Sequence, residues 1–61
     1  MSKLAQERTD FINQLHDVFI QRTGRGAFAF ISISDAMTLF DVYLISSDEA
    51  GFFIGRYVRS F

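Results

Sequence analysis

The chain contains no cysteine and only one histidine. Without thiolates, a disulfide framework and a cysteine-ligated metal are excluded, and His16 alone does not make an imidazole-based zinc site. Proline is absent as well, and no low-complexity tract or linker interrupts the sequence. We therefore expect a single domain over residues 1–61 that holds neither a metal nor a cofactor.

The chain also lacks a large excess of positive or negative charge, and it lacks a long uninterrupted apolar run. A net charge of −1 favours neither a broadly basic DNA-coating protein nor an acidic mimic of nucleic acid. The longest apolar region, residues 27–45, contains Asp35, Asp41 and several hydroxyl groups, so no membrane span is predicted. No apolar core follows Lys3 as a signal peptide would require, and we expect a cytoplasmic location.

Apolar side chains, in contrast, are abundant. Hydrophobic residues make up 49% of the chain, and eight of the residues are phenylalanine. A chain of this size buries only about 60% of the surface that it exposes when unfolded. Small domains without disulfides or metals are commonly stabilised by association with other copies. We therefore expect a homo-oligomer, most simply a dimer.

A first helix is predicted over residues 2–23. Apolar residues recur there with the helical period, and polar residues fill the opposite side. Ser2 is placed to cap the start, and Gly24 follows Thr23 as the glycine that commonly ends a helix. Arg22 in the last turn suits the helix dipole. The apolar stripe consists of Leu4, Phe11, Ile12, Leu15, Val18 and Phe19.

The residues after the first helix favour strands. Residues 27–34 alternate between Ala or Ile on one side and Phe or Ser on the other, as a strand does. Residues 39–45 and 52–58 are rich in residue types that suit a pleated sheet, and a polar loop ending in Gly51 joins them. We therefore predict an α+β fold, in which the N-terminal helix packs on a small antiparallel sheet. The strand lies at about 27–33, a helical turn around 35–40, and a hairpin at about 41–59.

An all-α fold of three helices with a short strand stays open as the alternative. Ser34 and Asp35 suit the start of a short helix, and Ser46 with Glu49 fits a capping box before the last segment. Gly51 and Gly55 weaken that last helix, because each costs roughly 1 kcal/mol relative to alanine. The helical faces would be Ala36, Leu39, Phe40, Tyr43 and Leu44, then Ala50, Phe53, Ile54, Tyr57, Val58 and Phe61.

Nothing in the sequence predicts an enzyme. His16 lies at the edge of the apolar stripe, and a general base there would need a nucleophile and an orienting group that the sequence does not display. The seven carboxylates are scattered. The one adjacent pair, Asp48 and Glu49, lies in a predicted loop rather than in a cleft. A non-enzymatic protein is expected.

The leading functional hypothesis is a small protein-binding module that acts as a regulator, an inhibitor or an assembly factor. Its partners would be other copies of itself and another protein. Phenylalanine, tyrosine and arginine are typical of interface centres, and the C-terminal segment concentrates all three. The predicted protein-binding residues are Phe52, Phe53, Arg56, Tyr57 and Arg59.

The alternative hypothesis is a regulator that binds DNA or a single-stranded nucleic acid. Four of the six cations lie near the end of the first helix and in the C-terminal segment, with aromatic residues between them. Arginine interleaved with aromatic rings is typical of single-strand binding. The remaining charges oppose a basic field, which favours the protein-binding hypothesis. The nucleic-acid-binding residues would be Arg22, Arg25, Arg56 and Arg59.

Overall fold

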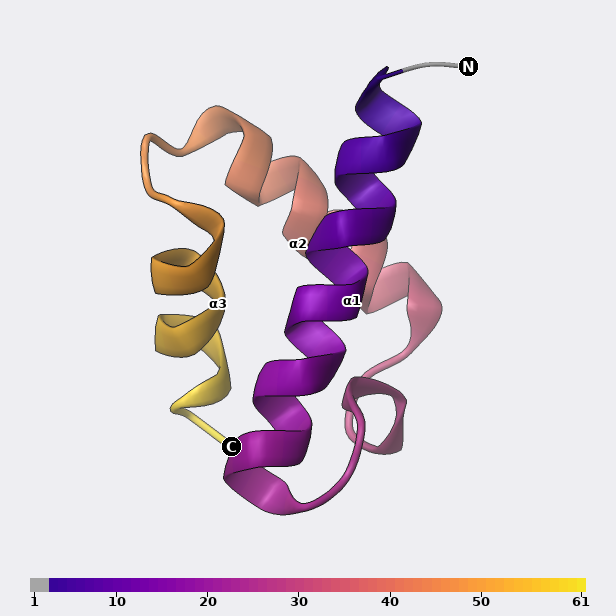
Figure 1. Ribbon diagram of the computed structural model, residues 1–61, viewed down its shortest axis with the longest axis vertical. Coiled ribbons are helices and arrows are strands. Elements are labelled where there is room, and N and C mark those ends of the chain that lie inside the picture. Colours follow the sequence, from indigo (N-terminus) through magenta and orange to yellow (C-terminus); the bar gives the residue numbers. More distant parts are fainter. Residues whose placement is uncertain (1–2) are drawn as a thin grey trace.

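A computed structural model of the protein describes residues 3–61, which form three α-helices and one short 3-10 turn, with no strand among them. The order is α1 (Lys3–Thr23), η1 (Ala27–Ala29), α2 (Ile33–Ile45) and α3 (Ala50–Val58). At about 1.5 Å per residue, α1 spans nearly the whole 32 Å length of the molecule. In Figure 1, α2 passes behind α1, and α3 runs beside α1 toward the end of that helix.

The first helix matches its prediction within the described residues. Phe11, Leu15 and Phe19 form its buried stripe. Gly24 follows the helix with a φ of 83°, and its N–H donates to the carbonyl of Ile20 at 2.8 Å, as in a glycine-terminated helix. The predicted cap at Ser2 lies outside the described residues.

The predicted strand at 27–33 is wrong. Its first three residues form η1, with Ala27 buried against α1, and the chain then turns into α2. Ser32 caps α2: its side chain accepts from the N–H of Asp35 at 3.1 Å, and the Asp35 carboxylate accepts from the N–H of Ser32 at 3.2 Å. This capping box fixes the start of α2 two residues before the helix start considered at Ser34 and Asp35. The alternation over residues 27–34 is therefore incidental.

The predicted hairpin at about 41–59 is also wrong, because α2 continues to Ile45 and residues 50–58 form α3. Ile54 and Val58 are buried on the inner face of α3, as the helical alternative requires. The capping box expected from Ser46 and Glu49 does not form. Glu49 occupies the N-cap position itself, without a side-chain hydrogen bond. The α+β class is thus replaced by an all-α fold, and the short strand of the alternative is absent from residues 3–61.

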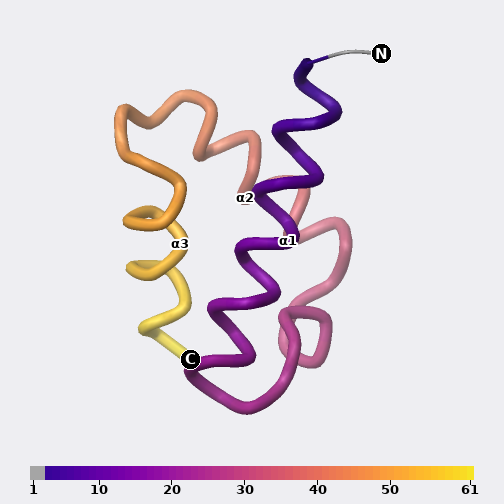
Figure 2. Tube along the Cα trace, in the orientation of Figure 1, coloured from indigo at the N-terminus to yellow at the C-terminus, as the bar shows by residue number. Residues whose placement is uncertain are grey.

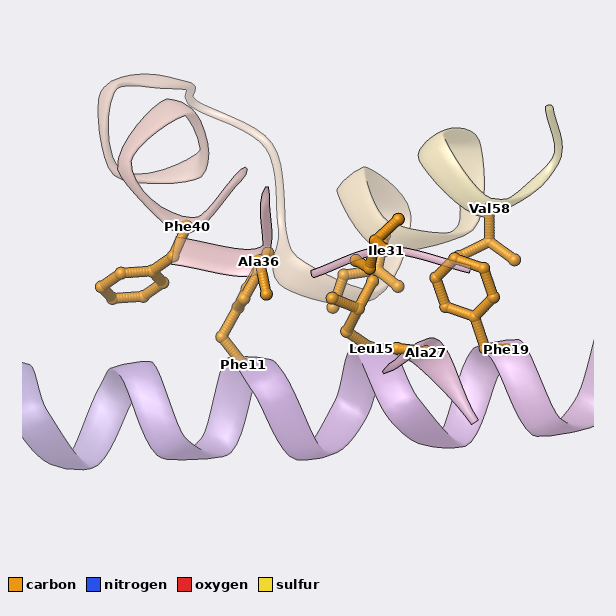
Figure 3. Packing of buried hydrophobic residues seen from close by; sticks show 9 residues of the cluster. Phe11, Leu15, Phe19, Ala27, Ile31, Ala36, Phe40 and Val58 are labelled. Carbon is orange, nitrogen blue, oxygen red and sulfur yellow. The ribbon is translucent and has the colours of Figure 1, made fainter. Parts of the chain in front are cut away.

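The core lies along the buried stripe of α1 (Figure 3). Nine residues form it: Phe11, Leu15, Phe19, Ala27, Ile31, Ala36, Phe40, Ile54 and Val58. Aromatic rings extend it at both ends. Phe11 stacks on Tyr43 with ring centroids 5.0 Å apart, and Phe19 meets Phe61 edge-on at 5.1 Å. The chain end therefore returns to the last turns of α1, as the trace in Figure 2 shows.

Candidate protein-binding surfaces

The solvent-facing side of α3 is the first candidate surface. It carries Phe52, whose residue is 72% exposed, together with two exposed arginines. Two glycines lie on the same side, and they leave a shallow depression of about 320 Å³ beside the phenylalanine ring. An alanine Cβ at Gly55 would meet nothing within 4 Å, so this side of the helix is open. We call it the outer face of α3; it consists of Gly51, Phe52, Gly55, Arg56 and Arg59.

The structure separates the five predicted protein-binding residues into two groups. Phe52, Arg56 and Arg59 share the outer face of α3. Phe53 and Tyr57 lie on the inner side, partly buried against the core. Phe53 meets the ring of Tyr43 with centroids 5.6 Å apart, and Tyr57 meets the ring of Phe61 at 5.3 Å. The last two therefore contribute to packing within the monomer.

Burial also affects the chemistry of Tyr57. Desolvation raises the pKa of its hydroxyl above the ordinary value, and the negative charge of Asp35 raises it further. The phenolate form is thus disfavoured in the folded protein. Tyr57 serves as a neutral aromatic residue of the core edge.

A groove between the first half of α1 and the loop after α2 is the second candidate surface. Its floor contains the partly exposed ring of Tyr43, which stacks on the buried ring of Phe11, and its volume is about 370 Å³. The α1 side consists of Glu7, Asp10, Phe11 and Gln14. The opposite side consists of Tyr43, Leu44, Ser46, Ser47, Asp48 and Ala50. We call this surface the loop groove.

The loop groove is acidic. Three carboxylates line it, from Glu7, Asp10 and Asp48, and none of its lining residues is a cation. Arg56 forms an ion pair with Asp48 from outside the groove. Asp10 accepts a hydrogen bond from the neutral side chain of Gln6 at 3.0 Å, which leaves its charge in place. The groove thus combines an aromatic floor with a negative rim.

Sequence reasoning missed this groove. Its α1 carboxylates are separated from Asp48 by most of the chain, so the sequence alone does not bring them together. Only the packing of α2 on α1 brings them to one opening. One feature of the sequence does indicate an acidic surface. Glu7 and Asp10 are three residues apart on one helix, and this spacing places them next to each other on the same side.

The structure gathers three of the four arginines named for nucleic-acid binding. Arg22 donates from its guanidinium to the carbonyl of Arg59 at 3.1 Å, which ties the end of α1 to the end of α3. Arg56 and Arg59 share the outer face of α3. Arg25 lies in the turn after α1. The ion pair with Asp48 neutralises Arg56 in part.

His16 has a structural role. Its Nδ1 accepts a hydrogen bond from the N–H of Ala27 at 3.3 Å, so the ring anchors the turn that leads into η1. The ring lies directly over Gly26, where an alanine Cβ would approach its Cε1 to 1.9 Å. Glycine is required here by close approach. Within residues 3–61, no group of three or more potential ligands could hold a metal ion.

No family model, no curated protein and no solved structure matches the chain. None of the helices in the described residues combines the length and apolar character needed to cross a membrane.

Proposed function

We propose that the protein is a non-enzymatic, self-associating module that binds another protein as a regulator, an inhibitor or an assembly factor. The observation that carries this proposal is the exposure of large apolar side chains. Among residues 3–61, eleven such side chains are more than a third exposed, and three are far more so: Ile45 at 87%, Phe52 at 72% and Ile33 at 68%. Exposed apolar surface of this extent is typical of interaction sites.

The size of the molecule supports association. Its accessible surface is 4323 Å², and a standard interface buries about 800 Å² of each partner, which is about a fifth of that surface. One face of the molecule is therefore sufficient for a dimer. The outer face of α3 is the preferred contact, because an exposed phenylalanine beside arginines has the composition of an interface centre.

The proposed non-enzymatic role rests on the side chain that a catalytic reaction would most readily use as a general base. The single imidazole, His16, is engaged with the backbone of the η1 turn. We retain a cytoplasmic location as part of the proposal.

Sedimentation velocity over a protein concentration range of about 1 to 200 µM tests self-association. We expect a dimer that forms within this range and a melting temperature that rises with concentration. A folded monomer at the highest concentration, with a constant melting temperature, would contradict the proposal.

Nucleic-acid binding is the second candidate, favoured by the contact between Arg22 and the end of α3. It predicts affinity for oligonucleotides at low salt that falls steeply as salt is added. The double substitution Arg22→Ala and Arg59→Ala should weaken this binding. Absence of binding to single- and double-stranded oligonucleotides at about 20 mM salt would remove this candidate.

A further inference from the structure

The outer face of α3 has the shape and charge of an inserting surface. Phe52 projects from it with most of its surface in water, and Arg59 lies on the same side of the helix. Gly55 lies beside the ring, and a Cβ there would meet nothing within 4 Å, so a neighbouring molecule can approach the backbone closely at this position. An aromatic anchor bordered by a cation is the residue pairing that binding hot spots favour.

The loop groove has complementary properties. Its floor contains the partly exposed ring of Tyr43, which offers an aromatic contact to an entering ring, whereas Phe11, stacked on Tyr43, is buried. No ion pair within residues 3–61 neutralises Glu7 or Asp10. An occupant that presents an aromatic side chain and a cation therefore matches both the floor and the rim. The outer face of α3 presents both.

The two surfaces are neighbours on one molecule. Ala50 lines the loop groove, and Phe52 follows it by two residues on the same helix. A two-fold axis can therefore place the Phe52 of each copy at the groove of the other, which makes a closed, self-complementary contact. The same arrangement places the arginine of one copy opposite the carboxylates of the other, rather than placing like charges opposite each other.

We propose that the loop groove of one copy receives Phe52 of a second copy, with Arg59 of that copy opposite Glu7 and Asp10. This inference rests on the self-association proposed above, and it specifies the surfaces that form the dimer. It also explains why the most exposed aromatic residue lies beside an acidic, aromatic-floored opening.

Phe52→Ala tests the inserting ring. Each dimer would lose two buried rings, and a hot-spot loss of about 30-fold for each raises the dissociation constant about 1,000-fold. Phe28→Ala is the matched control, because Phe28 is the same residue type, is 47% exposed and lines neither the groove nor the outer face of α3; its dissociation constant should stay within about threefold of the unmodified protein. Equal effects of the two substitutions would overturn the inference.

A charge exchange tests the groove as the acceptor. Arg59→Glu and Glu7→Arg should each weaken the dimer when studied alone, because each places like charges together. Mixed in equal amounts, they should form a heterodimer, since one contact regains the original pair and the other the reversed pair. Circular dichroism confirms that each variant is folded before the mixture is analysed by sedimentation.

The outcomes separate the two proposals. A mixture that stays monomeric overturns the loop groove as the acceptor. An unmodified protein that dimerises, with a dimer unaffected by Phe52→Ala, overturns the groove inference and leaves self-association intact. The sedimentation experiment described above extends to about 200 µM, a concentration at which a standard interface should form a dimer. An unmodified protein that is still monomeric there overturns both proposals.

Discussion

Two phenylalanines, one in α1 and one in α3, have opposite environments in this fold. Phe19 is fully buried, and its ring meets those of Phe30, Tyr57 and Phe61 at centroid distances of 5.4, 6.5 and 5.1 Å. Phe52 is 72% exposed, and within residues 3–61 no ring contacts it. The first side chain stabilises the fold, and the second is exposed to solvent.

The difference follows from helix geometry. Phe19 continues the stripe of Phe11 and Leu15 along α1, where each fourth residue returns to the same side. Phe52 lies on the opposite side of α3 from Ile54 and Val58. Folding and association should therefore respond separately to changes in the two regions.

Replacing Phe19 should have the largest effect. Phe19→Ala removes a fully buried ring and leaves a cavity, which costs about 3–5 kcal/mol of unfolding free energy. A domain of this size seldom has more than about 3–5 kcal/mol in total. We expect loss of the helical circular dichroism signal at every protein concentration. A variant that unfolds in urea with a loss below about 1 kcal/mol would contradict the assignment of Phe19 to the core.

Gly26→Ala should have the next largest effect. The new Cβ would collide with the His16 ring, so the ring must move and release the N–H of Ala27. We expect a loss of about 1–3 kcal/mol in urea unfolding. The matched control is Gly55→Ala, where the Cβ meets open space and alanine should stabilise α3 by about 0.5–1 kcal/mol. Two changes of the same sign would refute the close approach of His16 to Gly26.

Alkaline pH should lower the free energy of unfolding through the ionisation of Tyr57. The pKa of its hydroxyl is raised in the folded state, so the unfolded state releases its proton first as the pH increases. The resulting stability is fully present below a pH of about 10, the ordinary value for tyrosine, and is lost as the pH rises through the raised pKa. Urea midpoints from pH 8 to 11 should fall more steeply for the unmodified protein than for Tyr57→Phe. Parallel curves would show that Tyr57 does not contribute.

Replacing Phe52 should have the smallest effect on folding. Alanine is a better helix former than phenylalanine, and little surface is buried at this position. The unfolding free energy at low protein concentration should change by less than about 0.5 kcal/mol. The melting temperature should nevertheless lose its rise with concentration, because the proposed dimer would no longer form. A large loss of monomer stability would instead place Phe52 in the core.

The sequence was most informative where one periodic pattern was strong and uninterrupted. The stripe from Phe11 to Phe19, followed by Gly24, predicts α1 within about one residue of its observed start and end. The helical alternative also identifies the inner face of α3, including Ile54 and Val58. Of the protein-binding prediction, the structure places Phe52, Arg56 and Arg59 on one exposed surface, although their binding role stays a prediction.

The sequence misled where composition and local pattern disagreed. Residues 27–58 are rich in aromatic and branched residues, which are typical of strands, yet they form η1, α2 and α3. The apolar stripe of α1 supplies a surface on which Ala36 and Phe40 pack with helical spacing. That packing contributes more than residue propensity does, so the helices form despite the glycines in α3.

By itself, the sequence determined that no cysteine is present to form a disulfide, that an amphipathic helix precedes Gly24, and that nearly half of the residues are hydrophobic. Only the tertiary structure decided which phenylalanines are enclosed and which are exposed. It also brought Glu7 and Asp10 to the same opening as Asp48. The physical reason is that helical periodicity is local, whereas burial and the loop groove depend on contacts between segments far apart in the chain.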